Sequence, residues 1–148
     1  MLSRGWALDA GLWLALWREC EAREWGGVAL GLEFEVLVPS RAGVYLITSN
    51  PPNHLHAEPF TSLCNVLYAG QASVSIRTRF RAHCTNSQPG VMEVRHCFDA
   101  KSLRFWWSEE SSASTINRME ALLIDCFGPP ANRQRGRGAR LMPGVPAG

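Results

Sequence analysis

The chain has 148 residues, of which 46% are hydrophobic and 19% are charged, so it is long enough to bury one core and too short for two ordinary ones. Its net charge of +2 hides an asymmetry, because residues 1–35 carry three arginines and six acids, which leaves twelve basic and seven acidic residues for 36–148. Only Lys101 among those twelve is lysine. Since the planar guanidinium binds phosphate through two parallel hydrogen bonds, the composition is compatible with a nucleic-acid partner.

The composition also excludes several classes of protein. The longest apolar run, GLWLALW at residues 11–17, is about a third of the length of a membrane-spanning helix, so we expect no membrane segment. We expect a cytoplasmic protein, associated with the nucleoid if the source is bacterial. The five cysteines are scattered and form no C-x-x-C pair, which argues against a disulfide framework and against a standard zinc module.

The first part of the chain is predicted to hold one helix and three strands. Apolar residues recur every four positions between residues 7 and 24, as on the buried face of an amphipathic helix. Acidic and apolar residues alternate in EFEV at 33–36, which predicts a short half-buried strand. Two apolar, β-rich runs predict two further strands on either side of a long segment with three prolines; they are GVYLI at 43–47 and NVLYA at 65–69.

The second part is predicted to hold a helix, a strand and a second helix. Apolar residues spaced by four predict a helix over about 74–84, and KSLRFWWSEE at 101–110 predicts a strand. The pattern at 111–127 predicts a helix with a serine near its start, stopped by a Gly-Pro-Pro sequence. The last residues, 133–148, have four arginines, no acid and many glycines and prolines, which predicts a disordered basic tail.

These elements predict an α/β (α+β) fold with a small, mainly antiparallel central sheet flanked by helices. We divide the chain into an N-terminal helical extension at 1–35, one domain at 36–132, and the basic tail at 133–148.

A carboxylate lies within the apolar stripe of the last predicted helix. At 100° per residue, Glu120 falls about 40° from Ile116, inside the arc of apolar side chains. A carboxylate there is costly unless it is neutralised, hydrogen-bonded or bound to a metal. The alternative is that Glu120 lies at the edge of the stripe and reaches solvent or one arginine. Asp125 points away from the stripe and is expected to be a solvated surface acid.

Basic side chains border the apolar line of the helix predicted at 74–84. Arg79 and His83 are four residues apart on one border, and Arg77 and Arg81 form a second such pair toward the other side. The alternative to a functional role is an ordinary basic helix face.

Six features of this chain are similar, in order and in helix or strand placement, to the signature positions of the GIY-YIG nucleases. They are GVY at 43–45, YAG at 68–70, Arg79, His83, Glu120 and Asn132, so the resemblance covers roughly residues 43–132. The chain departs from the family at Ala69, the middle residue of the second tripeptide, and in a longer gap between the tripeptides. The arginine also comes one residue late after Gly70, which leaves Arg77 as an alternative to Arg79.

The resemblance implies a metal-dependent DNA endonuclease that hydrolyses phosphodiester bonds. Glu120 would hold one Mg²⁺ or Mn²⁺, Arg79 would clamp the scissile phosphate, and Tyr45 would act as the general base. A free phenol has a pKa of about 10, so the last role requires neighbouring positive charge that favours the phenolate. The implied catalytic residues are Tyr45, Tyr68, Arg79, His83 and Glu120, with Gly43, Gly70 and Asn132 as positions that shape the site.

Other arginines are predicted to contact the DNA backbone in a salt-dependent way, namely Arg77, Arg81, Arg133 and Arg135. Cutting both strands with one site per chain favours a homodimer or two successive nicks. Two other hypotheses remain open. In the first, the chain is a nucleic-acid-binding module that keeps the GIY-YIG-like fold without cutting. In the second, it is a structural domain in which Glu120 and an arginine form an internal ion pair.

Overall fold

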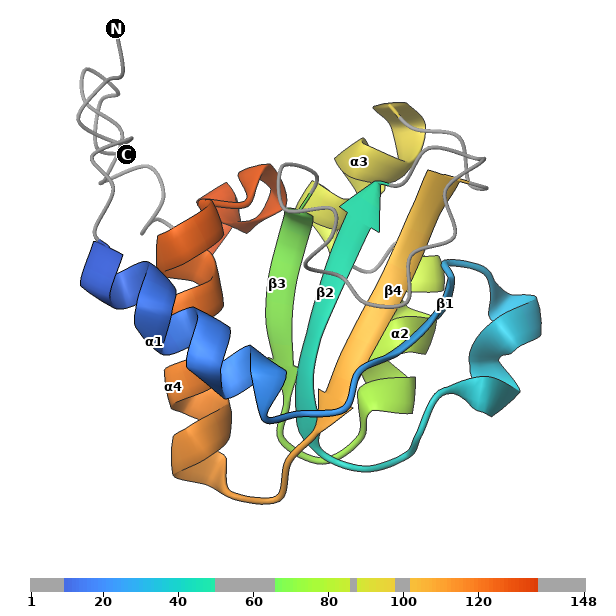
Figure 1. Cartoon of the computed structure of the whole chain (residues 1–148). Coiled ribbons are helices and arrows are strands. Elements are labelled where there is room, and N and C mark those ends of the chain that lie inside the picture. Colours follow the sequence, from blue (N-terminus) through green and yellow to red (C-terminus); the bar gives the residue numbers. More distant parts are fainter. Residues whose placement is uncertain (1–9, 50–65, 86–87, 98–101, 136–148) are drawn as a thin grey trace, which may run out of the picture.

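The structure is a computed structural model that describes residues 10–49, 66–85, 88–97 and 102–135. In this part of the chain it confirms the predicted α+β class, with an antiparallel sheet flanked by helices (Figure 1). The elements in chain order are α1 (Ala10–Glu21), β1 (Gly26–Ala29), the 3₁₀ helix η2 (Leu32–Leu37), β2 (Gly43–Ser49), β3 (Val66–Ala72), α2 (Ile76–Cys84), α3 (Pro89–Cys97), β4 (Leu103–Glu109), α4 (Ala113–Phe127) and the 3₁₀ helix η5 (Pro130–Arg135).

The sheet has four strands in the order β1-β4-β2-β3, and every neighbouring pair is antiparallel. The two strands that carry the tripeptides, β2 and β3, are therefore neighbours, and β3 is an edge strand. Their register places Tyr45 opposite Gly70 and Ile47 opposite Tyr68. Because side chains alternate between the two faces of a strand, Tyr45 and Tyr68 project from the same face of the sheet.

Helices cover both faces of the sheet. In Figure 1, α1 and α4 lie on one side of the strands and α2 lies on the other. The face toward α2 packs an aromatic core that includes Tyr45, Tyr68, Phe80 and Phe105. The face toward α1 and α4 packs a mostly aliphatic core around Trp106, whose indole Nε1 donates a 2.9 Å hydrogen bond to Oγ1 of Thr48 on β2, and it includes Val44, Leu46, Ala69, Ile116, Met119 and Leu123.

Helices α2 and α4 begin two residues after their predicted starts and end at the predicted residues. Ser75 and Ser112 are the N-cap residues of α2 and α4, and the hydroxyl of each accepts a 3.3 Å hydrogen bond from a backbone N–H three residues later. α4 ends at Gly128, which adopts the left-handed conformation with φ of 54° that glycine tolerates best. The two prolines that follow prevent the helix from continuing.

The strand predicted at residues 33–36 is wrong, because this segment forms η2 instead. The Arg77 guanidinium donates hydrogen bonds to the backbone oxygens of Val38 (2.7 Å) and Val36 (3.4 Å), which places these carbonyls near α2 rather than beside a strand. Only Phe34 in the segment packs against the core, and Val36 is 74% exposed. Alternation of acidic and apolar residues thus did not reflect alternate burial here.

Besides the 3₁₀ helices, two elements have no counterpart in the sequence prediction, namely β1 and α3. β1 pairs with β4, so the N-terminal extension contributes a strand to the sheet as well as a helix. Its Gly26 and Gly27 lie against the rings of Trp107 and Trp106, where an added Cβ would overlap the indoles. α3 begins at Pro89 and is short, and the Gln88 side chain accepts a 2.7 Å hydrogen bond from the backbone N–H of Val91 near its start.

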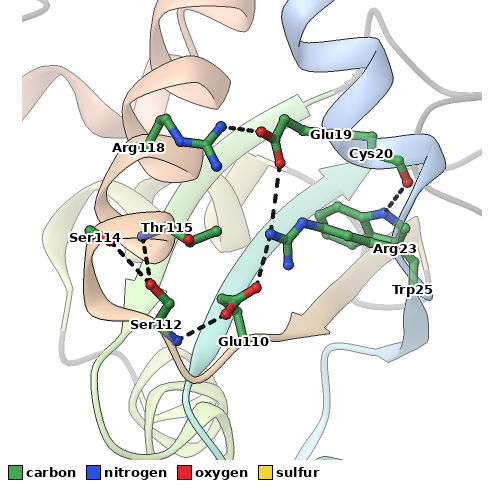
Figure 2. A network of polar contacts seen from close by, with 9 residues as sticks. All are labelled: Glu19, Cys20, Arg23, Trp25, Glu110, Ser112, Ser114, Thr115 and Arg118. Carbon is green, nitrogen blue, oxygen red and sulfur yellow. Dashed lines mark hydrogen bonds and ion pairs between the residues drawn. The ribbon is translucent and has the colours of Figure 1, made fainter.

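Ion pairs fasten α1 to the end of β4 and to α4 (Figure 2). The Arg23 guanidinium lies between two carboxylates, 3.8 Å from Glu19 and 3.0 Å from Glu110. Glu19 also pairs with Arg118 on α4, and Glu110 accepts a 2.9 Å hydrogen bond from the backbone N–H of Ser112. The apolar face of α1 and these charges at its rim together hold the helix on the sheet.

No helix in the described part of the chain is long and apolar enough to cross a membrane. The tail was predicted to be disordered over residues 133–148, which is wrong for 133–135 because they belong to η5. Residues 136–148 lie outside the described residues.

Candidate functional site

Both tyrosines lie in the aromatic core between the sheet and α2. The ring centroids of Tyr45 on β2 and Tyr68 on β3 are 6.0 Å apart, with an interplanar angle of 25°. Phe105 on β4 stacks on the other side of Tyr45, at 4.9 Å. Each tyrosine side chain is 2% exposed, so the two phenols are part of the packed interior of this face.

His83 on α2 completes a buried cluster with the tyrosines. Its Nε2 is 2.8 Å from Oη of Tyr45, which is the distance of a good hydrogen bond, and its ring centroid is 5.1 Å from that of Tyr68. His83 is itself 3% exposed. When the phenol donates its proton to Nε2, the buried contact joins two neutral groups. We call Tyr45, Tyr68 and His83 the phenol–imidazole cluster.

The two glycines of the tripeptides are required by close packing. A Cβ at Gly70 would lie 2.5 Å from Cζ and Oη of Tyr45 and 2.9 Å from Cε1 of Tyr68. At Gly43, a Cβ would overlap the carbonyl oxygen of Ser108 and lie 2.8 Å from Cδ1 of Ile76. Both contacts are closer than real Cβ atoms tolerate, so Gly70 admits both tyrosine rings and Gly43 admits the neighbouring strand β4 and α2.

The structure separates the three arginines of α2. Arg77 is bound to the backbone of η2, as described above, and Arg81 forms an ion pair with Glu35 in which Nε lies 3.1 Å from Oε2. Hydrogen bonding to Arg81 holds the pKa of Glu35 below its ordinary value. Arg79 is exposed and has no ion pair among the described residues. Of the three, only Arg79 thus has a guanidinium that the described fold does not use.

Glu120 lies in the apolar stripe of α4, as predicted, and an amide is among its partners. The side chain is 9% exposed, and Oε1 accepts a 3.3 Å hydrogen bond from Nε2 of Gln71 on β3. Gln71 was not among the site residues predicted from the sequence. Its position next to Gly70, on the opposite face of β3, was the available signal. Asp125 is exposed, as expected.

A single catalytic pocket requires Tyr45 and Tyr68 to face the helices that carry Arg79 and Glu120, and this expectation is wrong for Glu120. Since Tyr45 and Tyr68 project toward α2 whereas α4 packs on the other face of the sheet, the phenols do not face the helix that carries Glu120. The edge strand β3 lies between them, because Gly70 contacts the phenols and the adjacent Gln71 contacts Glu120. The phenol–imidazole cluster and Glu120 thus lie on opposite faces of the sheet, with β3 between them.

Asn132 in η5 ties the segment after α4 to the same strand. Its Oδ1 accepts a 3.0 Å hydrogen bond from the backbone N–H of Ala69, and its Nδ2 donates a 2.8 Å hydrogen bond to the backbone oxygen of Ala69. The side-chain amide therefore pairs with β3 much as a neighbouring strand would. Ala69 itself is fully buried under α4, where a larger side chain would hold that helix farther from the strand.

Other groups near these residues do not form a second site. Burial raises the pKa of the Cys84 thiol to about 11, so it stays protonated at neutral pH and is a poor nucleophile. Among the described residues, no three His, Cys, Asp or Glu side chains gather as they would around a metal ion. The side chains of Arg133 and Arg135 lie outside what the structure describes.

A depression of about 500 Å³ lies between the end of α1 and the end of β4. Trp25, Trp107, Glu24 and Glu109 are among the residues that line it. Two carboxylates and one guanidinium, that of Arg23, line it, so its lining carries more negative than positive charge and does not favour a phosphodiester backbone.

The chain matches no protein-family model, no curated protein and no solved structure. The assignment of the candidate site therefore depends on the residues and their geometry.

Proposed function

We propose that this chain is a metal-dependent DNA endonuclease of the GIY-YIG type, acting on phosphodiester bonds in the cytoplasm. The observation that supports it best is the buried hydrogen bond between Tyr45 and His83, with Tyr68 packed against both and Gly70 left without a side chain to admit the rings. These residues come from two strands and a helix, and the aromatic packing of a strand does not by itself require a histidine at hydrogen-bond distance.

In this proposal Tyr45 accepts a proton from the attacking water while its own proton moves to Nε2 of His83. A free phenol and a free imidazole differ by about 3.5 pKa units, so a complete transfer before attack would cost about 5 kcal/mol. We therefore expect the two proton transfers to accompany the attack. As the acceptor of the phenol proton, His83 replaces the neighbouring positive charge that the role of Tyr45 as general base was expected to require.

Arg79 is assigned to the scissile phosphate, in preference to Arg77. The guanidinium of Arg77 would have to give up its hydrogen bonds to Val36 and Val38 in order to bind a phosphate. Arg79 is on the same helix as His83, one turn earlier, and is exposed to an incoming ligand. A two-pronged contact from it would stabilise the charge that develops on the phosphate oxygens.

Glu120 is assigned to a divalent cation, Mg²⁺ or Mn²⁺. One carboxylate suits Mg²⁺ because this ion retains much of its water shell, and the Gln71 amide adds no charge of its own beside Glu120. When bound, the ion would supply Lewis-acid stabilisation of the leaving oxygen. Since Glu120 and the phenols lie on opposite sides of β3, the phosphate has to approach the outer edge of that strand, and the phenols have to become accessible when it binds.

A second candidate function is a nucleic-acid-binding module that does not cut. The observation in its favour is the burial of both phenols, together with the position of Glu120 across the strand from them. A scaffold that has lost its reaction can keep the packing of Tyr45 and His83 while the catalytic groups are no longer exposed to substrate.

Plasmid cleavage separates the two functions. We expect purified protein with Mg²⁺ or Mn²⁺ to nick or linearise supercoiled DNA, and Glu120→Gln to reduce the single-turnover rate by at least about 100-fold. Asp125→Asn, an equivalent change at an exposed acid on the same helix, is the control and should cut like the wild type. Undiminished cutting by Glu120→Gln would refute the assignment. Salt-dependent binding without any cutting by the wild type would favour the binding module.

A further inference from the structure

Gln71 lies on β3 directly after the YAG tripeptide, and its side chain points to the face of the sheet opposite the phenols. It pairs in register with Val44, on the face of the sheet that α4 covers. Its side chain is half-buried and its Nε2 donates the 3.3 Å hydrogen bond to Glu120. The strand therefore presents a glycine to the phenol–imidazole cluster and, at the next residue, an amide to the carboxylate.

The chemical nature of this partner matters. An arginine or lysine at the same place would neutralise Glu120 and compete with any cation for the carboxylate. An amide donates a hydrogen bond and adds no net charge, so it constrains the carboxylate while its negative charge persists. At 3.3 Å the hydrogen bond is at the long end of the usual range, so its main contribution is to orientation rather than to stability.

The backbone position of Glu120 is fixed by other contacts. α4 packs on β3 through Ala69, and Asn132, beyond the end of α4, binds the backbone of the same residue at 3.0 and 2.8 Å. These contacts determine how far the helix lies from the strand. They do not determine the side-chain torsions of Glu120, on which the hydrogen bond from Gln71 acts directly.

We propose that Gln71 is a positioning residue, which orients the Glu120 carboxylate at the outer edge of β3 for a divalent cation. The proposal rests on the proposed function, since it assigns a cation to Glu120. Groups that orient the ligands of a metal typically change its affinity by about 10- to 100-fold when they are removed.

Mn²⁺ binding to the full chain tests this by titration calorimetry. Gln71→Met keeps the length of the side chain and removes the donor, so we expect the Kd for Mn²⁺ to rise by about 10-fold or more. The Mn²⁺ concentration for half-maximal plasmid cutting should rise by the same factor. Gln88→Met, which removes a half-buried glutamine that caps α3, is the matched control and should leave both quantities unchanged.

Gln71→Glu gives an independent measurement. It places a second carboxylate next to Glu120, and like charges at this distance disfavour the folded state when no cation is present. We expect a Tm below that of Gln71→Met in chelator, and a larger rise in Tm on adding Mn²⁺ than the wild type shows. A purely structural glutamine would not produce that cation-dependent difference.

The outcomes separate this inference from the proposed function. If Glu120→Gln abolishes Mn²⁺ binding and cutting while Gln71→Met binds Mn²⁺ like the wild type, the positioning role is overturned and the endonuclease stands. If the wild type binds Mn²⁺ in a Gln71-dependent way and never cuts DNA, the positioning role is supported and the endonuclease fails. Absence of Mn²⁺ binding to the wild type would overturn the positioning role.

Discussion

The polar contacts around β3 and those around α1 are of two different kinds. Around β3 they are buried and can be made between neutral groups, namely the phenol of Tyr45 with His83 and the amide of Asn132 with the backbone of Ala69. Around α1 they are ion pairs at a partly exposed rim, centred on Arg23 and its two glutamates (Figure 2). Buried neutral contacts are expensive to leave incomplete, whereas exposed ion pairs contribute little. The candidate site therefore holds polar contacts that are costly to break, whereas the contacts at the rim of α1 can be lost at little cost.

The largest effect on stability is expected from Gly70→Ala, which breaks the packing of the phenol–imidazole cluster. The new methyl group would lie 2.5 Å from the Tyr45 ring, which is itself fixed by Phe105, His83 and the sheet. We expect a loss of about 3 kcal/mol or more in the free energy of unfolding, at the upper end of the range for overpacking, measured by chemical denaturation. Gly31→Ala is the matched control, because the methyl group there meets only the mobile end of Glu33. Equal stability of the two variants would contradict the tight packing described here.

An intermediate effect is expected from Asn132→Ala. The change removes two hydrogen bonds and leaves the backbone N–H and C=O of Ala69 without the amide, at a cost of about 1–3 kcal/mol. The same change at Asn117, which is exposed on α4, should alter stability by less than about 0.5 kcal/mol. Urea denaturation of the two variants measures the difference. A loss of unfolding free energy at Asn117 as large as that at Asn132 would contradict a stabilising role of the contact between Asn132 and β3.

The smallest effect is expected from Glu110→Gln at the rim. The backbone N–H of Ser112 and the Arg23 guanidinium hold the pKa of Glu110 below its ordinary value of 4.5. Its contribution to stability is therefore fully present above about pH 4.5 and is lost as the pH falls through the lower pKa of the folded state. We expect Glu110→Gln to cost no more than about 1 kcal/mol at pH 7, and the difference from the wild type to shrink on acidification.

Denaturation curves between pH 7 and pH 3 measure this pH dependence. Glu21→Gln, at an exposed acid of α1 that has no ion pair among the described residues, serves as the control and should not show the effect. A difference between wild type and Glu110→Gln that grows toward pH 3 would contradict the stated origin of the shift.

Periodicity of the sequence predicts the elements that bury one regular face. The strands at Tyr45 and Tyr68 and the helices at His83 and Glu120 have such faces, and all four form as expected. Periodicity does not predict η2, since its carbonyls are bound by Arg77, which is distant in sequence. It also misses β1, because two glycines are poor strand formers and are tolerated there by the tryptophans packed against them.

The same limit applies to the candidate site. Alternation along β2 and β3 predicts that Tyr45 and Tyr68 share a face, and the four-residue spacing places Arg79 and His83 on one border of the apolar line of α2. The structure buries His83 and exposes Arg79. Neither pattern specifies which face of the sheet a helix covers, since that depends on how the connections cross the sheet. The position of α4 opposite the phenols, and with it the contact of Glu120 with Gln71, therefore required the structure.

The central claim is that a cation held by Glu120 lies at the edge of β3, one residue away from the phenol–imidazole cluster. Paramagnetic broadening by Mn²⁺ in amide NMR spectra of ¹⁵N-labelled protein tests it most directly. We expect substoichiometric Mn²⁺ to broaden first the signals of Gly70, Gln71 and Glu120, and Glu120→Gln to remove the broadening. Broadening centred instead on Glu24 and Glu109, or none at β3, would contradict the claim.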